Sequence, residues 1–311
     1  MKYAVLGGGG FIGSHLTESL LMLGHDVTIL DRPQARYLAR AKRAGAKIVK
    51  GDFLNIYDLK KTIAGAEVVY HLISTTVPQT ATNDPLFDAE TNLLGTVKLL
   101  QEAKKAQVRR IIFTSSGGTV YGIPQKVPIT EDHPTEPIGA YGISKLTIEK
   151  YLHLYWTLYE VQYCVLRVAN AYGERQPIKE SQGVIPAFLD KIMHDEPLEI
   201  WGDGSVIRDY VHVNDIVNAL LKSALYREPT GIFNIGAGRG HSLNELIEIM
   251  KNVIGKSIRV NYASGRTFDV PVNILDISHA KAQLVWEPII GIEMGIGRMF
   301  EWMLARQHQD K

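Results

Sequence analysis

A tyrosine and a lysine stand four positions apart in the segment Tyr141-Gly-Ile-Ser-Lys145. Residues four apart lie on one face of a helix, so a helix that begins here would place the phenol beside the ammonium group. Tyrosine is a weak base at neutral pH, but a nearby positive charge stabilises its phenolate. The pair therefore predicts that Tyr141 accepts a proton from a substrate and that Lys145 assists it.

A third candidate for this chemistry lies upstream, where an apolar run, Ile111-Ile-Phe-Thr-Ser-Ser-Gly-Gly-Thr-Val-Tyr-Gly122, leads into hydroxyls and glycines. Such a run is typical of a buried strand, and α/β sheets bind their ligands beyond the carboxyl ends of the strands. We choose Ser116 as the residue that binds the substrate oxygen and shares the proton relay. Ser115 and Thr119 are alternatives for parts of that role.

Four consecutive glycines follow the first apolar run, in Gly7-Gly-Gly-Gly-Phe-Ile-Gly13. Glycine allows a tight turn, the close approach of a pyrophosphate to the backbone, and the packing of the following helix on a strand. The helix N-terminus then offers free N–H groups to the anion. The motif predicts a dinucleotide site whose residues in this loop are Gly7, Gly10, Phe11, Ile12 and Gly13.

The choice between NAD and NADP depends on the end of the second predicted strand, where Asp31 stands 18 residues after Gly13. A carboxylate there binds the adenosine ribose hydroxyls and repels a 2′-phosphate, so NAD is favoured. The neighbouring Arg32 could bind a 2′-phosphate and keeps NADP open. Asp52, followed by Phe53, is placed at the adenine edge, although a simple turn aspartate is nearly as good an explanation.

Short apolar runs alternate with helical patterns through the first half of the chain. This alternation predicts an α/β fold, a Rossmann-type doubly wound parallel sheet covered by helices on both faces. The expected strands are 3–6, 27–30, 47–49, 68–72, 110–113 and 162–168, and the expected helices are 11–23, 34–44, 56–64, 85–106 and 141–159.

After about residue 170 the pattern becomes irregular, and residues 170–181 are expected to form a loop. We assign residues 1–170 to a nucleotide-binding domain, joined by parts of 206–235, and residues 171–311 to a smaller mixed α/β substrate domain. Helices near 184–194, 213–226 and 242–254 and strands near 206–211, 231–235 and 257–261 are expected there.

Composition excludes several classes of protein. The chain of 311 residues carries 34 Lys and Arg against 33 Asp and Glu, so it lacks the basic surface of a nucleic-acid binder. No apolar run approaches the ~18 residues that span a bilayer, and no leader peptide is evident. The single cysteine, Cys164, suits a reducing cytoplasm. We expect a cytoplasmic protein with no metal site, no nucleic-acid partner and no membrane partner.

The sequence resembles the extended short-chain dehydrogenase/reductase family, and within it the nucleotide-sugar epimerases. The glycine loop, Asp31, Ser116, Tyr141 with Lys145, Leu166-Arg-Val-Ala-Asn170 and residues 201–213 follow in the order of the family. The resemblance implies C4 epimerisation of a UDP-sugar, either UDP-GlcNAc/UDP-GalNAc or UDP-glucose/UDP-galactose, through a transient 4-keto sugar, with tightly held NAD. It also implies a homodimer formed by the helices 91–106 and 141–159, where Tyr151, Tyr155, Trp156 and Tyr159 form a stripe.

The same resemblance implies residues that hold the substrate. Asn170 and Arg208 would bind the diphosphate, as would Arg266, while Asp269 would hold the uridine ribose. Two arginines suit bidentate binding of phosphate in a chain that is nearly neutral overall.

Two departures from the family bear on the substrate. Gly117 and Gly118 follow Ser116, where 4,6-dehydratases carry an Asp-Glu pair, so the dehydratase alternative loses its acid. Asn273 stands where members restricted to non-acetylated sugars tend to carry tyrosine, which predicts room for an N-acetyl group. A UDP-glucuronate 4-epimerase remains an alternative because of Arg175, as do a reductase and a binding module that reads NAD without turnover.

Overall fold

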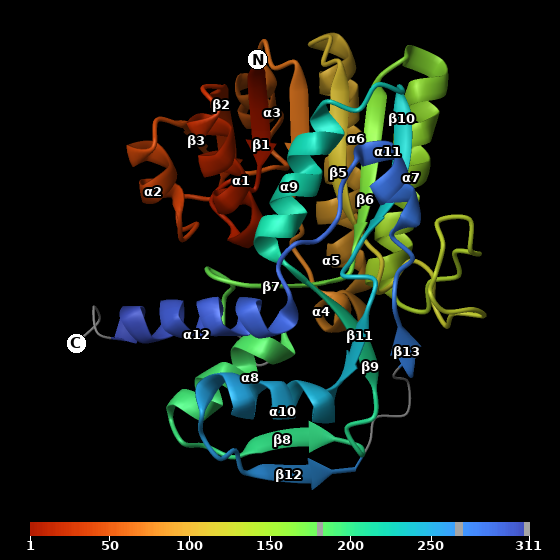
Figure 1. The fold of residues 1–311 in the computed structure, drawn as a ribbon. Coiled ribbons are helices and arrows are strands. Elements are labelled where there is room, and N and C mark those ends of the chain that lie inside the picture. Colours follow the sequence, from red (N-terminus) through yellow and green to blue (C-terminus); the bar gives the residue numbers. More distant parts are fainter. Residues whose placement is uncertain (179–182, 265–269, 308–311) are drawn as a thin grey trace.

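The structure is a computed structural model that describes residues 1–178, 183–264 and 270–307. Its larger part, the upper half of Figure 1, is a sheet of seven parallel strands in the order β10-β6-β5-β4-β1-β2-β3. The strands are β1 (Lys2–Leu6), β2 (Asp26–Asp31), β3 (Lys47–Lys50), β4 (Val68–His71), β5 (Arg110–Ser116), β6 (Gln162–Val168) and β10 (Thr230–Ile235). The order reverses between β1 and β4, where Rossmann-type sheets bind their ligands, so the predicted fold class is confirmed.

Helices cover both faces of this sheet. One face carries α1 (Phe11–Met22), α2 (Leu38–Arg43), α9 (Val213–Ala224) and α11 (Ser278–Leu284). The opposite face carries α3 (Ile56–Ile63), α6 (Gly95–Lys105) and α7 (Ala140–Tyr159). Alternate residues of a strand face opposite sides, so Val5 packs on the first set of helices and Leu6 on the second. The central strands are therefore largely apolar on both faces.

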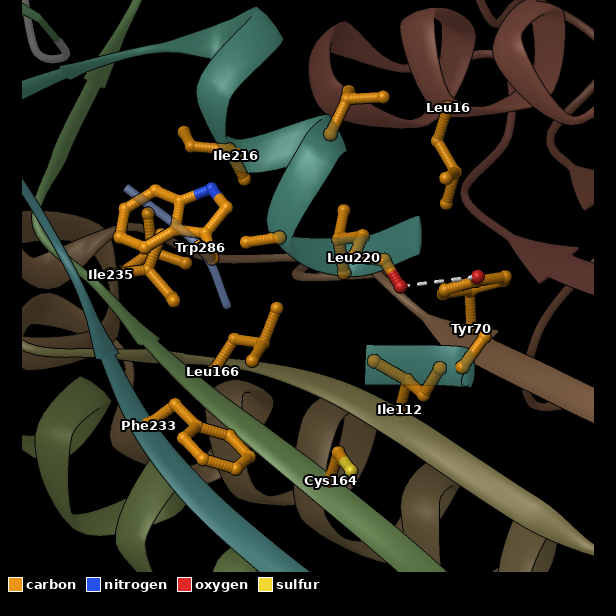
Figure 2. Packing of buried hydrophobic residues seen from close by; sticks show 14 of the residues in the cluster. Leu16, Tyr70, Ile112, Cys164, Leu166, Ile216, Leu220, Phe233, Ile235 and Trp286 are labelled. Atoms are coloured by element: carbon orange, nitrogen blue, oxygen red, sulfur yellow. Dashed lines mark hydrogen bonds between the residues drawn. The ribbon is translucent and has the colours of Figure 1, made fainter. Parts of the chain in front are cut away.

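Figure 2 shows the hydrophobic core between the sheet and the helices α1 and α9, which residues from the second half of the chain complete. Leu220 of α9 lies on the side of Leu16 of α1, and Ile216 of α9 lies beside the indole of Trp286. The hydroxyl of Tyr70 on β4 donates to the carbonyl of Leu220 at 3.2 Å. Because this polar atom has a partner, the ring can be buried in the core at little penalty.

The smaller part of the molecule lies below the sheet in Figure 1. It contains α8 (Val184–Met193), β8 (Leu198–Trp201), α10 (Leu243–Ile254), β12 (Val260–Ala263) and α12 (Ile292–Gln307). These elements share a hydrophobic core that is separate from the cores on the two faces of the large sheet. A short sheet links it to the larger part. That sheet has β9 (Ile207–His212) paired with β7 (Asn170–Tyr172), β11 (Gly240–Ser242) and β13 (Val272–Asn273).

Some elements differ from those expected. The helix expected at 85–106 is divided into α5 (Pro85–Asp88), a π-helical turn η1 (Ala89–Leu94) and α6. Residues 170–172 form strand β7 instead of loop, because β9 supplies their hydrogen-bond partners. β10 pairs with β6 at the edge of the large sheet, while the boundary at residue 170 stays a prediction. Among the described residues, no helix is long and apolar enough to cross a membrane.

Candidate active site

The glycine loop joins β1 to α1 and has almost no room for side chains. Gly7 has φ +87°, in the left-handed region that favours glycine. A Cβ atom on Gly13 would lie 2.0 Å from the carbonyl oxygen of Gly7. The first turn of α1, which begins at Phe11, receives no side-chain cap from Gly10 and contains no acidic residue. Its free N–H groups and positive dipole end suit a pyrophosphate.

Asp31 ends β2 beside this loop, as expected from the sequence. Its carboxylate accepts hydrogen bonds from the backbone N–H of Gly9 at 2.9 Å and of Arg32 at 2.8 Å. Burial raises the pKa of Asp31, and these two N–H groups act in the opposite direction. The carboxylate is therefore fixed against the glycine loop, where it can accept bonds from ribose hydroxyls.

The other residues predicted to bind the cofactor differ in their exposure to solvent. Asp52 is exposed and accepts a hydrogen bond from the N–H of Leu54 at 2.8 Å, as a turn aspartate does. The Phe53 ring is buried against Gly95 and the ring of His71, so only the backbone of Phe53 is available to a ligand. Arg32 is exposed.

Tyr141 and Lys145 lie on the first turns of α7, which packs beside the end of β5. The ammonium of Lys145 is buried, donates to the carbonyl of Thr114 at 2.9 Å and lies 5.5 Å from the centre of the Tyr141 ring. Ser116 is the last residue of β5 and is half-buried. The structure thus places all three predicted catalytic residues at the carboxyl edge of the sheet.

Ser115 has a different environment from Ser116. Its buried hydroxyl donates to the carboxylate of Glu149 at 2.5 Å. Glu149, one turn beyond Lys145 on α7, forms a buried ion pair with Arg167 of β6 at 2.7 Å. The hydroxyl of Ser115 is therefore engaged in the protein interior, and Ser116 is the better candidate for contact with a substrate. Thr119, the other alternative, has a buried hydroxyl without a hydrogen-bond partner among the described residues.

Sequence reasoning missed the roles of Glu149 and Arg167. Burial alone would lower the pKa of Arg167, but its bonds to Glu149 outweigh this effect and raise that pKa. Arg167 also donates to the hydroxyl of Tyr121 at 2.9 Å. The available signal was an arginine within the apolar strand 162–168, because a buried charge requires a partner.

Three of the predicted substrate residues, Asn170, Arg208 and Asn273, lie on the sheet around β9. Asn170 on β7 donates its amide to the carbonyl of Asp209 at 3.0 Å. Arg208 on β9 is opposite Asn273 on β13 and donates to the carbonyl of Val270 at 2.6 Å. Asn273 donates to the carbonyl of Gly117 at 3.2 Å, directly after Ser116. Arg266 and Asp269 lie outside the described residues.

Comparison with known proteins agrees with this arrangement. The model of the NAD dependent epimerase/dehydratase family matches residues 3–236. The chain belongs to this family. A putative UDP-glucose 4-epimerase of Methanocaldococcus jannaschii is 38% identical over 303 residues, which are 96% of this chain and 97% of that protein.

Two solved structures are close in fold along their whole length. The UDP-glucose 4-epimerase of Thermotoga maritima with UDP-glucose has a TM-score of 0.94 and 34% identity, and the match covers 99% of this chain and 100% of that one. The UDP-N-acetylglucosamine 4-epimerase of Methanobrevibacter ruminantium, in complex with UDP-N-acetylmuramic acid, has a TM-score of 0.92 and 28% identity. That match covers 98% of both chains.

Proposed function

We propose that this protein is an NAD-dependent 4-epimerase of UDP-sugars. The observation that carries the proposal is the placement of Tyr141 and Lys145 on one face of α7, beside Ser116 at the end of β5. The glycine loop and Asp31 lie at the same edge of the sheet and fit NAD. The epimerase activity of its relatives and the NAD-dependent chemistry of the family agree with this assignment.

In the proposed reaction, Tyr141 takes the proton of the sugar C4 hydroxyl, and Lys145 stabilises the phenolate. Ser116 donates to the same sugar oxygen and holds it near Tyr141. Bound NAD supplies the acceptor for the C4 hydride and later the donor. The 4-keto sugar then turns within the site so that its opposite face is reduced. Tyr141 returns the proton to the C4 oxygen of the sugar.

The site favours epimerisation over 4,6-dehydration. A Cβ atom on Gly117 would lie 2.5 Å from a methyl carbon of Leu275 and 3.1 Å from the carbonyl oxygen of Arg167. A carboxylate side chain directly after Ser116 would therefore require the side chain of Leu275 and the backbone at Arg167 to shift. The uronic acid alternative is also weakened, because the guanidinium of Arg175 is paired with Glu18 at 2.6 Å and does not present itself to a sugar carboxylate.

The test is NMR of the purified protein, without added cofactor, incubated separately with UDP-glucose, UDP-GlcNAc and UDP-glucuronate. We expect a mixture of C4 epimers from UDP-glucose or UDP-GlcNAc, formed with NAD that was purified with the protein. If none of the three changes while NAD is bound, 4-epimerisation of these UDP-sugars is excluded.

Asn273 favours acceptance of N-acetylated sugars. Its side chain is buried beside Gly117, and its amide oxygen has no partner among the described residues. Replacing Asn273 by tyrosine should lower kcat/KM for UDP-GlcNAc relative to that for UDP-glucose by about 10- to 200-fold, because the larger ring fills this space. Asn273→Ser, which shortens the side chain, serves as the control. An unchanged ratio in the tyrosine variant would show that Asn273 does not select the substrate.

We further propose that the protein is a cytoplasmic homodimer. Of the stripe expected from the sequence, Tyr155 is buried in the core and Tyr151 and Trp156 pack against it, while Tyr159 is exposed. Large apolar side chains that are also exposed along α7 and at the end of η1 are Leu94, Ile143, Leu154 and Leu158. Such a patch is typical of a surface that pairs with another chain, and two helices from each copy would cover it. The buried, unpaired Cys164 suits a reducing compartment.

A further inference from the structure

Asp88 is a buried carboxylate outside the proposed catalytic set. Only 1% of it is exposed, and no lysine or arginine among the described residues forms an ion pair with it. An isolated buried charge is costly unless several donors stabilise it. Asp88 has three: the hydroxyl of Thr76, the amide of Asn92 at 2.9 Å and the hydroxyl of Ser144.

These three donors belong to three separate segments. Thr76 lies in the loop of residues 74–77, which leaves β4 at the ligand-binding edge of the sheet. Asn92 lies in η1 and also accepts the N–H of Thr75 at 3.0 Å. Ser144 lies on α7, directly before Lys145 and three residues after Tyr141. One carboxylate therefore joins the loop 74–77, the π-helical turn and the proposed catalytic helix.

The π-helical turn supports a functional reading of this junction. Such turns insert an extra residue into a helix, carry an energetic penalty and are frequent at functional sites. Here the turn brings Asn92 within reach of both Thr75 and Asp88. The carbonyl of Asn92 also accepts a hydrogen bond from the hydroxyl of Thr96 at 2.6 Å. Both the side chain and the backbone of Asn92 therefore form hydrogen bonds that stabilise the turn.

We propose that Asp88 is a positioning residue, which sets the distance between the proposed catalytic pair on α7 and the loop 74–77. This inference rests on the proposed epimerase function. The loop connects β4 to the helix α4 (Pro78–Asn83), next to the switch point where a dinucleotide binds, so a shift of α7 against it moves Tyr141 relative to the hydride acceptor. Displacements of about 1 Å in such a site reduce rates by about a hundred-fold.

The first variant is Ser144→Ala, which removes one donor and leaves Asp88 its other two. We expect kcat to fall about ten-fold and KM to change less than about two-fold, because substrate binding does not depend on this bond. The matched control is Ser223→Ala, since Ser223 is also buried in a helix and donates one bond, to the carbonyl of Leu220 at 2.8 Å. Ser223→Ala should lose as much thermal stability as Ser144→Ala but should keep the wild-type kcat.

A second pair of variants tests the carboxylate itself. Asp88→Ala should lower kcat about a hundred-fold, whereas Asp88→Asn should recover most of the loss, because its amide oxygen still accepts and its N–H can donate to Ser144. Equal kcat values in Ser144→Ala and Ser223→Ala, at equal stability, would overturn the positioning role.

Hydrogen exchange separates this inference from the proposed function. Amides of residues 74–77 and of the first turns of α7 should exchange faster in Ser144→Ala than in Ser223→Ala, whether or not the protein turns over a UDP-sugar. Unchanged exchange would overturn the positioning role. Absence of turnover in the wild-type protein, with faster exchange in Ser144→Ala, would instead overturn the epimerase function alone.

Discussion

Replacement of Tyr141 by phenylalanine is expected to reduce the epimerisation rate by about 10²- to 10⁴-fold, the range for loss of a general base. The ring remains and so does the contact of Lys145 with the carbonyl of Thr114, so NAD should still be bound. The measurement is kcat by NMR of the two epimers, together with the NAD released on denaturation.

Tyr151→Phe is the control for this experiment, because Tyr151 lies on the same helix and is half-buried. It should keep at least half of the wild-type rate. If Tyr141→Phe kept more than about a tenth of the rate, a different residue would have to accept the proton.

The buried pair of Glu149 and Arg167 should have the largest effect on stability. Both side chains are less than 5% exposed, and Arg167 binds the carboxylate through two nitrogens, at 2.7 and 3.2 Å. Glu149→Leu leaves the guanidinium buried without its counter-charge, which is expected to lower the free energy of unfolding by about 3–5 kcal/mol. Denaturant unfolding measures this change.

Two further variants make that result specific. The double variant Glu149→Leu/Arg167→Met removes both charges and should recover most of the loss, because apolar pairs can replace buried ion pairs. Glu248→Ala breaks the more exposed pair with Lys251 and should lower stability by less than about 1 kcal/mol. If the single and double variants lost equal stability, the loss would come from packing rather than from the unpaired charge.

Local sequence patterns predicted the parts of the fold that depend on neighbours in the chain. Glycine at 7–13 predicted the turn into α1, and Asp31 was placed correctly at the end of β2. The spacing of Tyr141 and Lys145 predicted that both lie on one helix, as the structure shows. In each case the residues that determine the local structure lie within one helix or strand or the turn next to it.

The remaining features depend on contacts between distant segments. Strand β7 is three residues long and exists because β9 pairs with it, about forty residues later in the chain. The helix expected at 85–106 contains a π-helical turn where Asp88 and Asn92 bond to the loop after β4. Glu149 and Arg167 were visible as charges, but only the packing of α7 on β6 brings them together.

The position of β10 at the edge of the sheet has a consequence for synthesis on the ribosome. A nascent chain that has emerged only to residue 170 exposes the edge of β6, and it also lacks α9 and Trp286, which bury one face of the sheet. The nucleotide-binding half therefore cannot finish folding as an N-terminal unit before the rest is made. Its last core residue, Trp286, is translated after most of the smaller part, so the two halves mature together, and the unpaired β6 edge must be protected from other chains until then.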